Sequence, residues 1–171
     1  LLVALVLGGI VAGVFGWLVG LPSLRLRGDY LAIVTLGFGE IIRVLILNID
    51  AVGGARGLPG IPHWADFFWV FLGVVVVIAL ARNLAHSTHG RAMFAIRDDE
   101  VAAEALGVDT TRYKVVAFVF GAFFAGVAGG LFAHYLSYLN PNSFTFIKSI
   151  EVIAMVVLGG MGSISGSVLA A

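Results

Sequence analysis

The sequence predicts an all-α membrane protein, a polytopic bundle of about five membrane-spanning helices. Of its 171 residues, 60% are hydrophobic and only 12% are charged, and the mean hydropathy is +1.06. Soluble domains have about 45–50% apolar and about 25% charged residues, so this composition argues against a water-soluble fold. No segment alternates with the period of two that membrane β-barrels require, and the apolar runs are too long for strands.

The first predicted span covers residues 1–24, which contain no charged side chain. As a helix it would be roughly 36 Å long, enough to cross a hydrocarbon core of about 30 Å. A short polar break follows, and the second predicted span covers residues 30–49. Glu40 and Arg43 interrupt this second span three positions apart, a spacing at which opposite charges can pair on one helical face. Charges at this depth normally face a bundle interior, a partner or a water-filled path. Glu40 and Arg43 are therefore either a polar patch beside a translocation path or an intrahelical or interhelical pair that fixes packing, and both interpretations stay open.

The next two segments are predicted to be a loop and a third span. Residues 50–66 contain several glycines and two prolines, which break helices and form turns. Residues 64–81 form the third predicted span, with Trp64 and Trp69 at interfacial depth.

The remaining chain contains one polar segment and two more spans. Residues 82–114 hold half of the charged residues and are predicted to be the one large aqueous loop. Residues 115–138 form the fourth predicted span, residues 140–142 a turn, and residues 149–171 the fifth predicted span.

The distribution of Lys and Arg predicts the orientation in the membrane. Two spans separate the first polar break from residues 82–114, so both lie on one side. Together they carry Arg25, Arg27, Arg82, Arg91, Arg97, Arg112 and Lys114, whereas the opposite loops carry only Arg56 and Lys148. Cytoplasmic loops are enriched in Lys and Arg, so the long polar segment is predicted to be cytoplasmic.

Small residues recur at helical spacing and predict close helix packing. In the first span the stripe comprises Gly8, Ala12, Gly16 and Gly20. In the later spans the candidates are Gly126, Gly130, Gly159, Gly160, Gly162 and Gly166. Small side chains let helix backbones approach closely in lipid. The segment 159–167 lacks the Gly-Lys-Ser/Thr ending of a phosphate-binding loop, so we interpret it as a packing surface or a local helix break.

Several kinds of site are not supported by the sequence. It contains no cysteine and only four histidines, and the histidines do not have the spacing of a metal site with three or four ligands. No nucleophile and base can be assigned to a shared pocket, so no metal, cofactor or catalytic residue is predicted. The net charge of zero gives no general attraction for nucleic acid.

A short helix is predicted inside the polar segment, over residues 98–107. Asp98 is the expected N-cap, Asp99 and Glu100 suit the positive end of the helix dipole, and Gly107 suits the left-handed position after the last turn. Glu100 and Glu104 are expected to form an acidic face. A helix this short is marginal alone in water, so it needs a surface to lie on.

Four stretches together resemble the LivM-type permeases of bacterial branched-chain amino acid importers of the ABC class. They are residues 24–40, 90–100, 103–108 and 158–163, which occur in the same order over most of the chain. The resemblance implies that residues 1–171 are a fragment of a single transmembrane permease domain. It also implies an inner-membrane, multi-pass protein that is not an enzyme. Related permeases for urea and short amides share the layout, and an ion-coupled transporter that uses Glu40 is the more distant alternative.

The resemblance further implies which partners the protein has and where they bind. The expected partners are a LivH-like second permease, two cytoplasmic ATPase subunits that hydrolyse ATP, and a periplasmic or surface amino-acid-binding protein. The residues expected to contact an ATPase subunit are Arg97, Asp98, Asp99, Glu100, Ala103, Glu104, Ala105 and Gly107. Glu40 and Arg43 would then lie beside the translocation path or form an interhelical pair.

Overall fold

The computed structural model describes residues 1–26 and 29–171. Arg27, one of the basic residues that predict the orientation in the membrane, lies outside the described residues. The main helices and strands in chain order are α1 (Leu2–Ser23), α2 (Asp29–Leu47), β1 (Leu58–Pro59), α3 (Phe67–His86), α4 (Thr88–Asp98), α5 (Glu100–Ala105), α6 (Thr110–Leu136), β2 (Tyr138–Leu139), α7 (Phe146–Leu158) and α8 (Ile164–Ala170). Short 3-10 turns are η1 (Asp50–Val52), η2 (Gly54–Arg56) and η3 (Pro141–Ser143). In the described residues five segments are long and apolar enough to cross a membrane, which confirms the all-α polytopic fold class.

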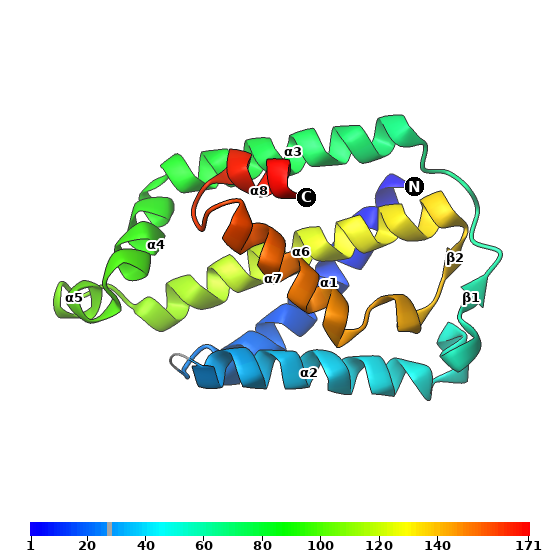
Figure 1. Ribbon diagram of the computed structural model, residues 1–171, viewed down its shortest axis with the longest axis horizontal. Helices are drawn as coiled ribbons and strands as arrows, with labels where there is room; N and C mark the ends of the chain where they lie inside the picture. The colour runs from blue at the N-terminus through cyan, green and yellow to red at the C-terminus, as the bar shows by residue number, and fades with distance from the viewer. Residues whose placement is uncertain (27–28) are drawn as a thin grey trace.

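The polar connections are sorted to opposite ends of the bundle (Figure 1). The C-terminal end of α1 and the start of α2 lie at the same end as α4 and α5, whereas β1 and β2 lie at the other end. This is the arrangement expected when two spans separate the two basic segments. At the far end the β strands pair antiparallel, with Leu58 opposite Leu139 and Pro59 opposite Tyr138, and so join the α2–α3 connection to the residues that follow α6.

The closest helix packing is between α1 and α6, along the predicted stripes of small residues. A Cβ added to Gly126 would lie 2.5 Å from the Cβ of Ala12 and 2.6 Å from the carbonyl oxygen of Gly8. A Cβ added to Gly130 would lie 2.8 Å from Cδ2 of Leu5. These distances are too short for a side chain, so both glycines allow the two backbones to approach.

The third helix begins and ends later than residues 64–81, the range predicted for it. It starts at Phe67 and continues to His86. The preceding residues pack against the end of α6 instead of continuing the helix: Ala65 is fully buried, and the Trp64 ring stacks on that of His134 at 5.5 Å.

The fifth predicted span, residues 149–171, is not one helix. The chain is helical from Phe146 to Leu158, breaks over residues 159–163 and is helical again from Ile164. Gly160 and Gly162 have φ angles of +89° and +96°, which an α-helix cannot contain. The backbones of Gly159 and Gly166 touch directly, with no space for a Cβ on either residue. The helix-break interpretation of this segment is therefore the one observed.

Candidate functional site

The polar segment begins with a sharp corner between α3 and α4. The Ser87 hydroxyl donates to the carbonyl of Leu84 at 2.6 Å and accepts from the amide of Gly90 at 3.1 Å, so it caps both helices. Gly90 is buried, and a Cβ there would collide with the carbonyl oxygens of Leu84 and Ala85. The corner therefore requires glycine, a role that the sequence pattern alone did not indicate.

Asp99, and not Asp98 as expected, is the N-cap of the short helix α5. Its Oδ1 accepts from the amides of Val101 and Ala102 at 2.9 and 3.0 Å. The prediction for Asp98 was wrong because α4 extends through Asp98, whereas an N-cap needs an extended backbone such as that of Asp99 (φ −155°, ψ 106°). The Asp98 carboxylate instead pairs with Arg97 at 2.8 Å.

The other end of α5 is closed by Gly107, as predicted. Gly107 has a φ of +83°, and its amide donates to the carbonyl of Glu104 at 2.9 Å. The Val108 amide donates to the carbonyl of Ala103 at 3.0 Å, which completes a Schellman motif. Both ends of this six-residue helix are therefore satisfied by local hydrogen bonds.

The acidic side chains of α5 point back to α6. A Glu100 oxygen lies 2.6 Å from the Lys114 ammonium, and these side chains are only 26% and 20% exposed. A Glu104 oxygen accepts from the hydroxyl of the buried Thr110 at 2.8 Å. The acidic face expected from the sequence therefore fixes α5 to the start of α6, where Asp109 caps α6 by accepting from the amide of Arg112.

Apart from Glu104, which is also exposed, the surface that α5 leaves exposed is apolar. Ala103 is buried against the protein, whereas Val101 is 65% and Leu106 is 85% exposed, and Ala102 and Ala105 lie in the open beside them. We call Val101, Ala102, Ala105 and Leu106 the apolar tip. The helix that carries the apolar tip, α5, lies at one extreme end of the bundle (Figure 1).

Arg97 connects this segment to the break between α7 and α8. Its guanidinium lies over the ring of Phe94, 5.0 Å from the centroid, and pairs with Asp98. A Cβ on Gly162 would lie 2.5 Å from Nη1 of Arg97, so the guanidinium occupies the space beside this glycine.

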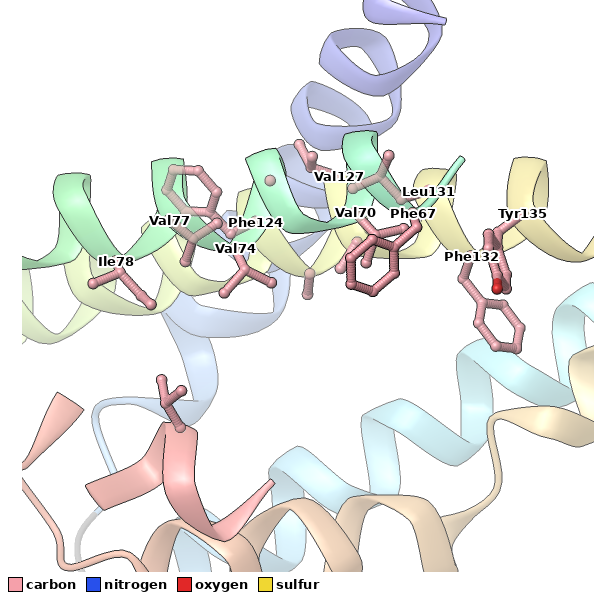
Figure 2. Close-up of a pocket in the computed structure, with 14 residues that line it drawn as sticks. Phe67, Val70, Val74, Val77, Ile78, Phe124, Val127, Leu131, Phe132 and Tyr135 are labelled. Atoms are coloured by element: carbon pink, nitrogen blue, oxygen red, sulfur yellow. The ribbon is translucent and has the colours of Figure 1, made fainter. Parts of the chain in front are cut away.

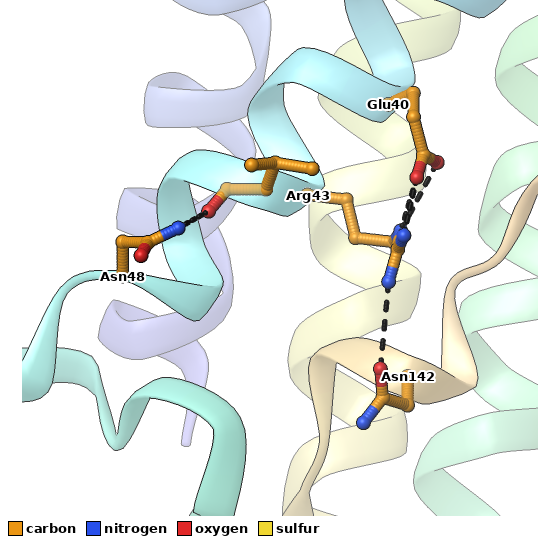
Figure 3. Close-up of polar contacts among 5 residues, drawn as sticks. Glu40, Arg43, Asn48 and Asn142 are labelled. Atoms are coloured by element: carbon orange, nitrogen blue, oxygen red, sulfur yellow. Dashed lines mark hydrogen bonds and ion pairs between the residues drawn. The ribbon is translucent and has the colours of Figure 1, made fainter.

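Glu40 and Arg43 pair within α2 and contact a second segment (Figure 3). Arg43 Nε donates to the two carboxylate oxygens of Glu40 at 3.1 and 3.0 Å, and its Nη1 donates to the Oδ1 of Asn142 in η3 at 3.4 Å. The ion pair itself is intrahelical, and the hydrogen bond from Arg43 to Asn142 links α2 to the turn before α7. A position beside a translocation path stays a prediction.

An apolar cavity of about 740 Å³ lies between α3, α6 and α8 (Figure 2). Its walls include Val70, Val74 and Ile78 from α3, Phe124 from α6 and Val168 from α8. Tyr135, at one end of the row of labelled side chains, carries the phenolic oxygen drawn there. Such a cavity suits aliphatic groups, and no motif in the sequence indicated it.

Two histidines close the opposite end of the bundle. The His63 Nδ1 donates to the carbonyl of His134 at 3.1 Å, and the His134 Nδ1 donates to the carbonyl of Pro62 at 2.9 Å. Each ring therefore binds the backbone beside the other, and the α2–α3 connection is held against the end of α6. We call these two hydrogen bonds the histidine clasp.

Five apolar segments and a capped corner outside them define a polytopic α-helical membrane protein. The chain belongs to the family described as the branched-chain amino acid transport system permease component, whose model matches residues 1–171. Its members named below are transport permease proteins and not enzymes.

The relatives include both kinds of permease that the sequence suggested. The chain is 42% identical to the LivM permease protein of Salmonella typhimurium and 40% identical to that of Escherichia coli K12, in each case over 96% of this chain and 47% of the relative. It is 35% identical to the LivH permease protein of Escherichia coli K12 over 56% of this chain and 30% of that relative. The chain thus spans about half the length of the LivM relatives it matches. No solved structure matches it.

Proposed function

We propose that this chain forms part of the transmembrane permease subunit of an ATP-driven importer of branched-chain amino acids. The observation that carries the proposal is the identity of 40–42% to LivM permease proteins over nearly the whole chain. In this function the chain encloses part of a translocation path and binds no cofactor. ATP is hydrolysed by partner subunits.

The proposed partners follow from the same relationship. A LivH-like permease would form the other half of the path, and the similarity of this chain to LivH proteins supports a pair of related subunits. Two ATPase subunits would bind on the cytoplasmic side, and a periplasmic or surface binding protein would deliver the amino acid. The excess of Lys and Arg supports a cytoplasmic position for the end that carries α4 and α5, in the bacterial inner membrane.

In this function the α4–α5 corner is the ATPase contact. The corner is rigid, because capped helices and two contacts to α6 fix it. Its exposed apolar tip offers the kind of surface that becomes buried between proteins. The side chains that touch the ATPase would thus be Val101 and Leu106, while Glu100 and Glu104 hold the helix in place.

The contact can be tested with two leucines that are almost equally exposed. Leu106 is 85% exposed on the apolar tip, and Leu158 is 84% exposed at the end of α7. Leu106→Ser should reduce the amount of ATPase that copurifies with the tagged permease, whereas Leu158→Ser should not. Equal retention in both variants would contradict a contact through the apolar tip.

The function is tested by ATP-dependent uptake into proteoliposomes. The full-length permease is reconstituted with its partner subunits, and uptake of radiolabelled leucine is measured with urea or a polar amino acid as competitor. The proposal predicts uptake that requires ATP and is inhibited by branched-chain amino acids only. Competition by urea would favour a urea or short-amide permease. Uptake that persists without ATP and stops when the proton gradient collapses would show ion coupling instead, an alternative that the pairing of Glu40 with Arg43 does not favour.

A further inference from the structure

Arg97 lies between two parts of the protein that are far apart in the sequence. On one side, its half-exposed guanidinium contacts the Phe94 ring and the Asp98 carboxylate within the α4–α5 corner. On the other side, it fills the space next to Gly162 in the break between α7 and α8. The planar guanidinium can contact a ring, a carboxylate and a backbone at once, which an ammonium group cannot do equally well.

Hydrogen bonds and an ion pair hold together the corner that carries Arg97. The capping residue Ser87 joins α4 to α3, and the Glu100–Lys114 pair joins α5 to α6. Only Asp99 separates α4 from α5, and its carboxylate caps α5. A displacement of α5 is therefore carried to the last turn of α4, where Arg97 lies.

The break that receives Arg97 is also compact. The backbones of Gly159 and Gly166 touch, and the Ser163 hydroxyl accepts from the amide of Gly166 at 3.0 Å. The position of the break therefore determines the position of α8. Since Val168 of α8 lines the apolar cavity, a shift of the break changes one wall of that cavity.

We propose that Arg97 is a positioning residue that couples the α4–α5 corner to α8 by lying against Gly162. The inference rests on the proposed function, in which an ATPase displaces the corner. It adds a route by which that displacement reaches the cavity between α3 and α6. The route differs from the direct one along the helix axes of α3 and α6, because it passes through a side chain.

The test measures the amount of leucine transported per ATP hydrolysed by the complete reconstituted complex. Arg97→Ala should lower this ratio about tenfold, within the range of coupling energies that such residues carry. Arg91→Ala is the matched control, because Arg91 is an exposed arginine of the same helix and, among the described residues, its side chain bonds locally to Thr88. The ratio of the control should stay at the wild-type value.

A second pair of variants separates the contact from backbone strain. Gly160 and Gly162 both have a positive φ, but a Cβ on Gly160 would meet nothing within 4 Å. Gly162→Ala should therefore lower the ratio more than Gly160→Ala. When Arg97 is also replaced by Ala, the two glycine variants should become equal, because the guanidinium that obstructs the Cβ is gone.

The possible outcomes distinguish the inference from the function on which it rests. If the wild type shows ATP-dependent uptake and Arg97→Ala has the same ratio as Arg91→Ala, the coupling inference is overturned while the proposed function stands. Equal effects of the two glycine variants in the presence of Arg97 overturn it as well. If the wild type shows no ATP-dependent uptake, both fail. Should Arg97→Ala not insert into the membrane, Arg97→Lys keeps the charge without the planar contact, and its ratio should again fall below that of the wild type.

Discussion

Replacement of Gly126 by alanine tests the contact between α1 and α6. The new Cβ would lie 2.5 Å from the Cβ of Ala12 and 2.6 Å from the carbonyl oxygen of Gly8. Carbon atoms in contact prefer about 3.5–4.0 Å, so the helices have to separate by about 1 Å. A gap of that size removes about a quarter to a half of the dispersion energy across the contact. Because part of the obstruction is backbone, a side-chain rotation cannot relieve it, and we expect a loss of about 1–3 kcal/mol of stability.

The assay measures the melting temperature of the full-length protein in detergent. Size-exclusion chromatography monitors the fraction that stays folded as the temperature rises. Gly129→Ala is the matched control on the same helix, since a Cβ there meets nothing within 4 Å. Gly126→Ala should melt at a lower temperature than the control. Adding Ala12→Gly should restore part of the loss, because it removes one of the two obstructions and leaves the Gly8 carbonyl in place. Equal melting temperatures for Gly126→Ala and Gly129→Ala would refute the packing argument.

Three further substitutions test other parts of the structure. Gly90→Ala should destabilise the α3–α4 corner by about 1–3 kcal/mol, because the new Cβ collides with two carbonyl oxygens, and residues 82–114 should then be proteolysed faster. An unchanged cleavage rate would contradict the requirement for glycine at this position. Asp99→Ala should destabilise α5 by about 1 kcal/mol, because the helix loses its N-cap, so amide exchange over residues 100–105 should accelerate more than in Asp98→Ala. Faster exchange in Asp98→Ala than in Asp99→Ala would identify Asp98 as the N-cap instead. Arg43→Ala should lower the melting temperature more than the double variant Glu40→Ala/Arg43→Ala, because the single replacement leaves the Glu40 carboxylate without its Arg43 partner at membrane depth. A lower melting temperature for the double variant would contradict this.

The sequence predicted the parts of this fold that depend on composition and local pattern. Apolar runs of about 20 residues identify the spans, because a helix of that length crosses the bilayer. The small residues around Gly126 predict close packing, because only small side chains allow it. Gly107 was placed correctly because a left-handed residue after a helix is usually glycine.

The features that the sequence left undecided depend on where each helix ends and on how one segment folds back on another. Residues 149–171 are mostly apolar, so they were predicted as one span, but the positive φ angles of Gly160 and Gly162 break the helix after Leu158. The sequence predicted that Glu100 and Glu104 share an acidic face, but not their partners, because Lys114 and Thr110 come close only when α5 folds back on α6. The choice between Asp98 and Asp99 depended on where α4 ends.

The contact between Arg97 and Gly162 has no local signature either. The two residues are far apart in the chain, and each has a plausible role within its own segment. Arg97 has an acidic neighbour in Asp98, and Gly162 lies in a glycine-rich turn. Only the placement of α7 and α8 against α4 brings them together.

The histidine clasp makes a closed ring of the chain from Pro62 to His134. The covalent chain joins α3 to α6 through α4 and α5 at one end, and two hydrogen bonds join their other ends. The clasp opposes separation of α3 and α6 at one end, and the covalent connection through α4 and α5 opposes it at the other. The helix α8, which provides the third wall of the cavity, lies outside this ring, so it can shift without breaking either hydrogen bond of the clasp.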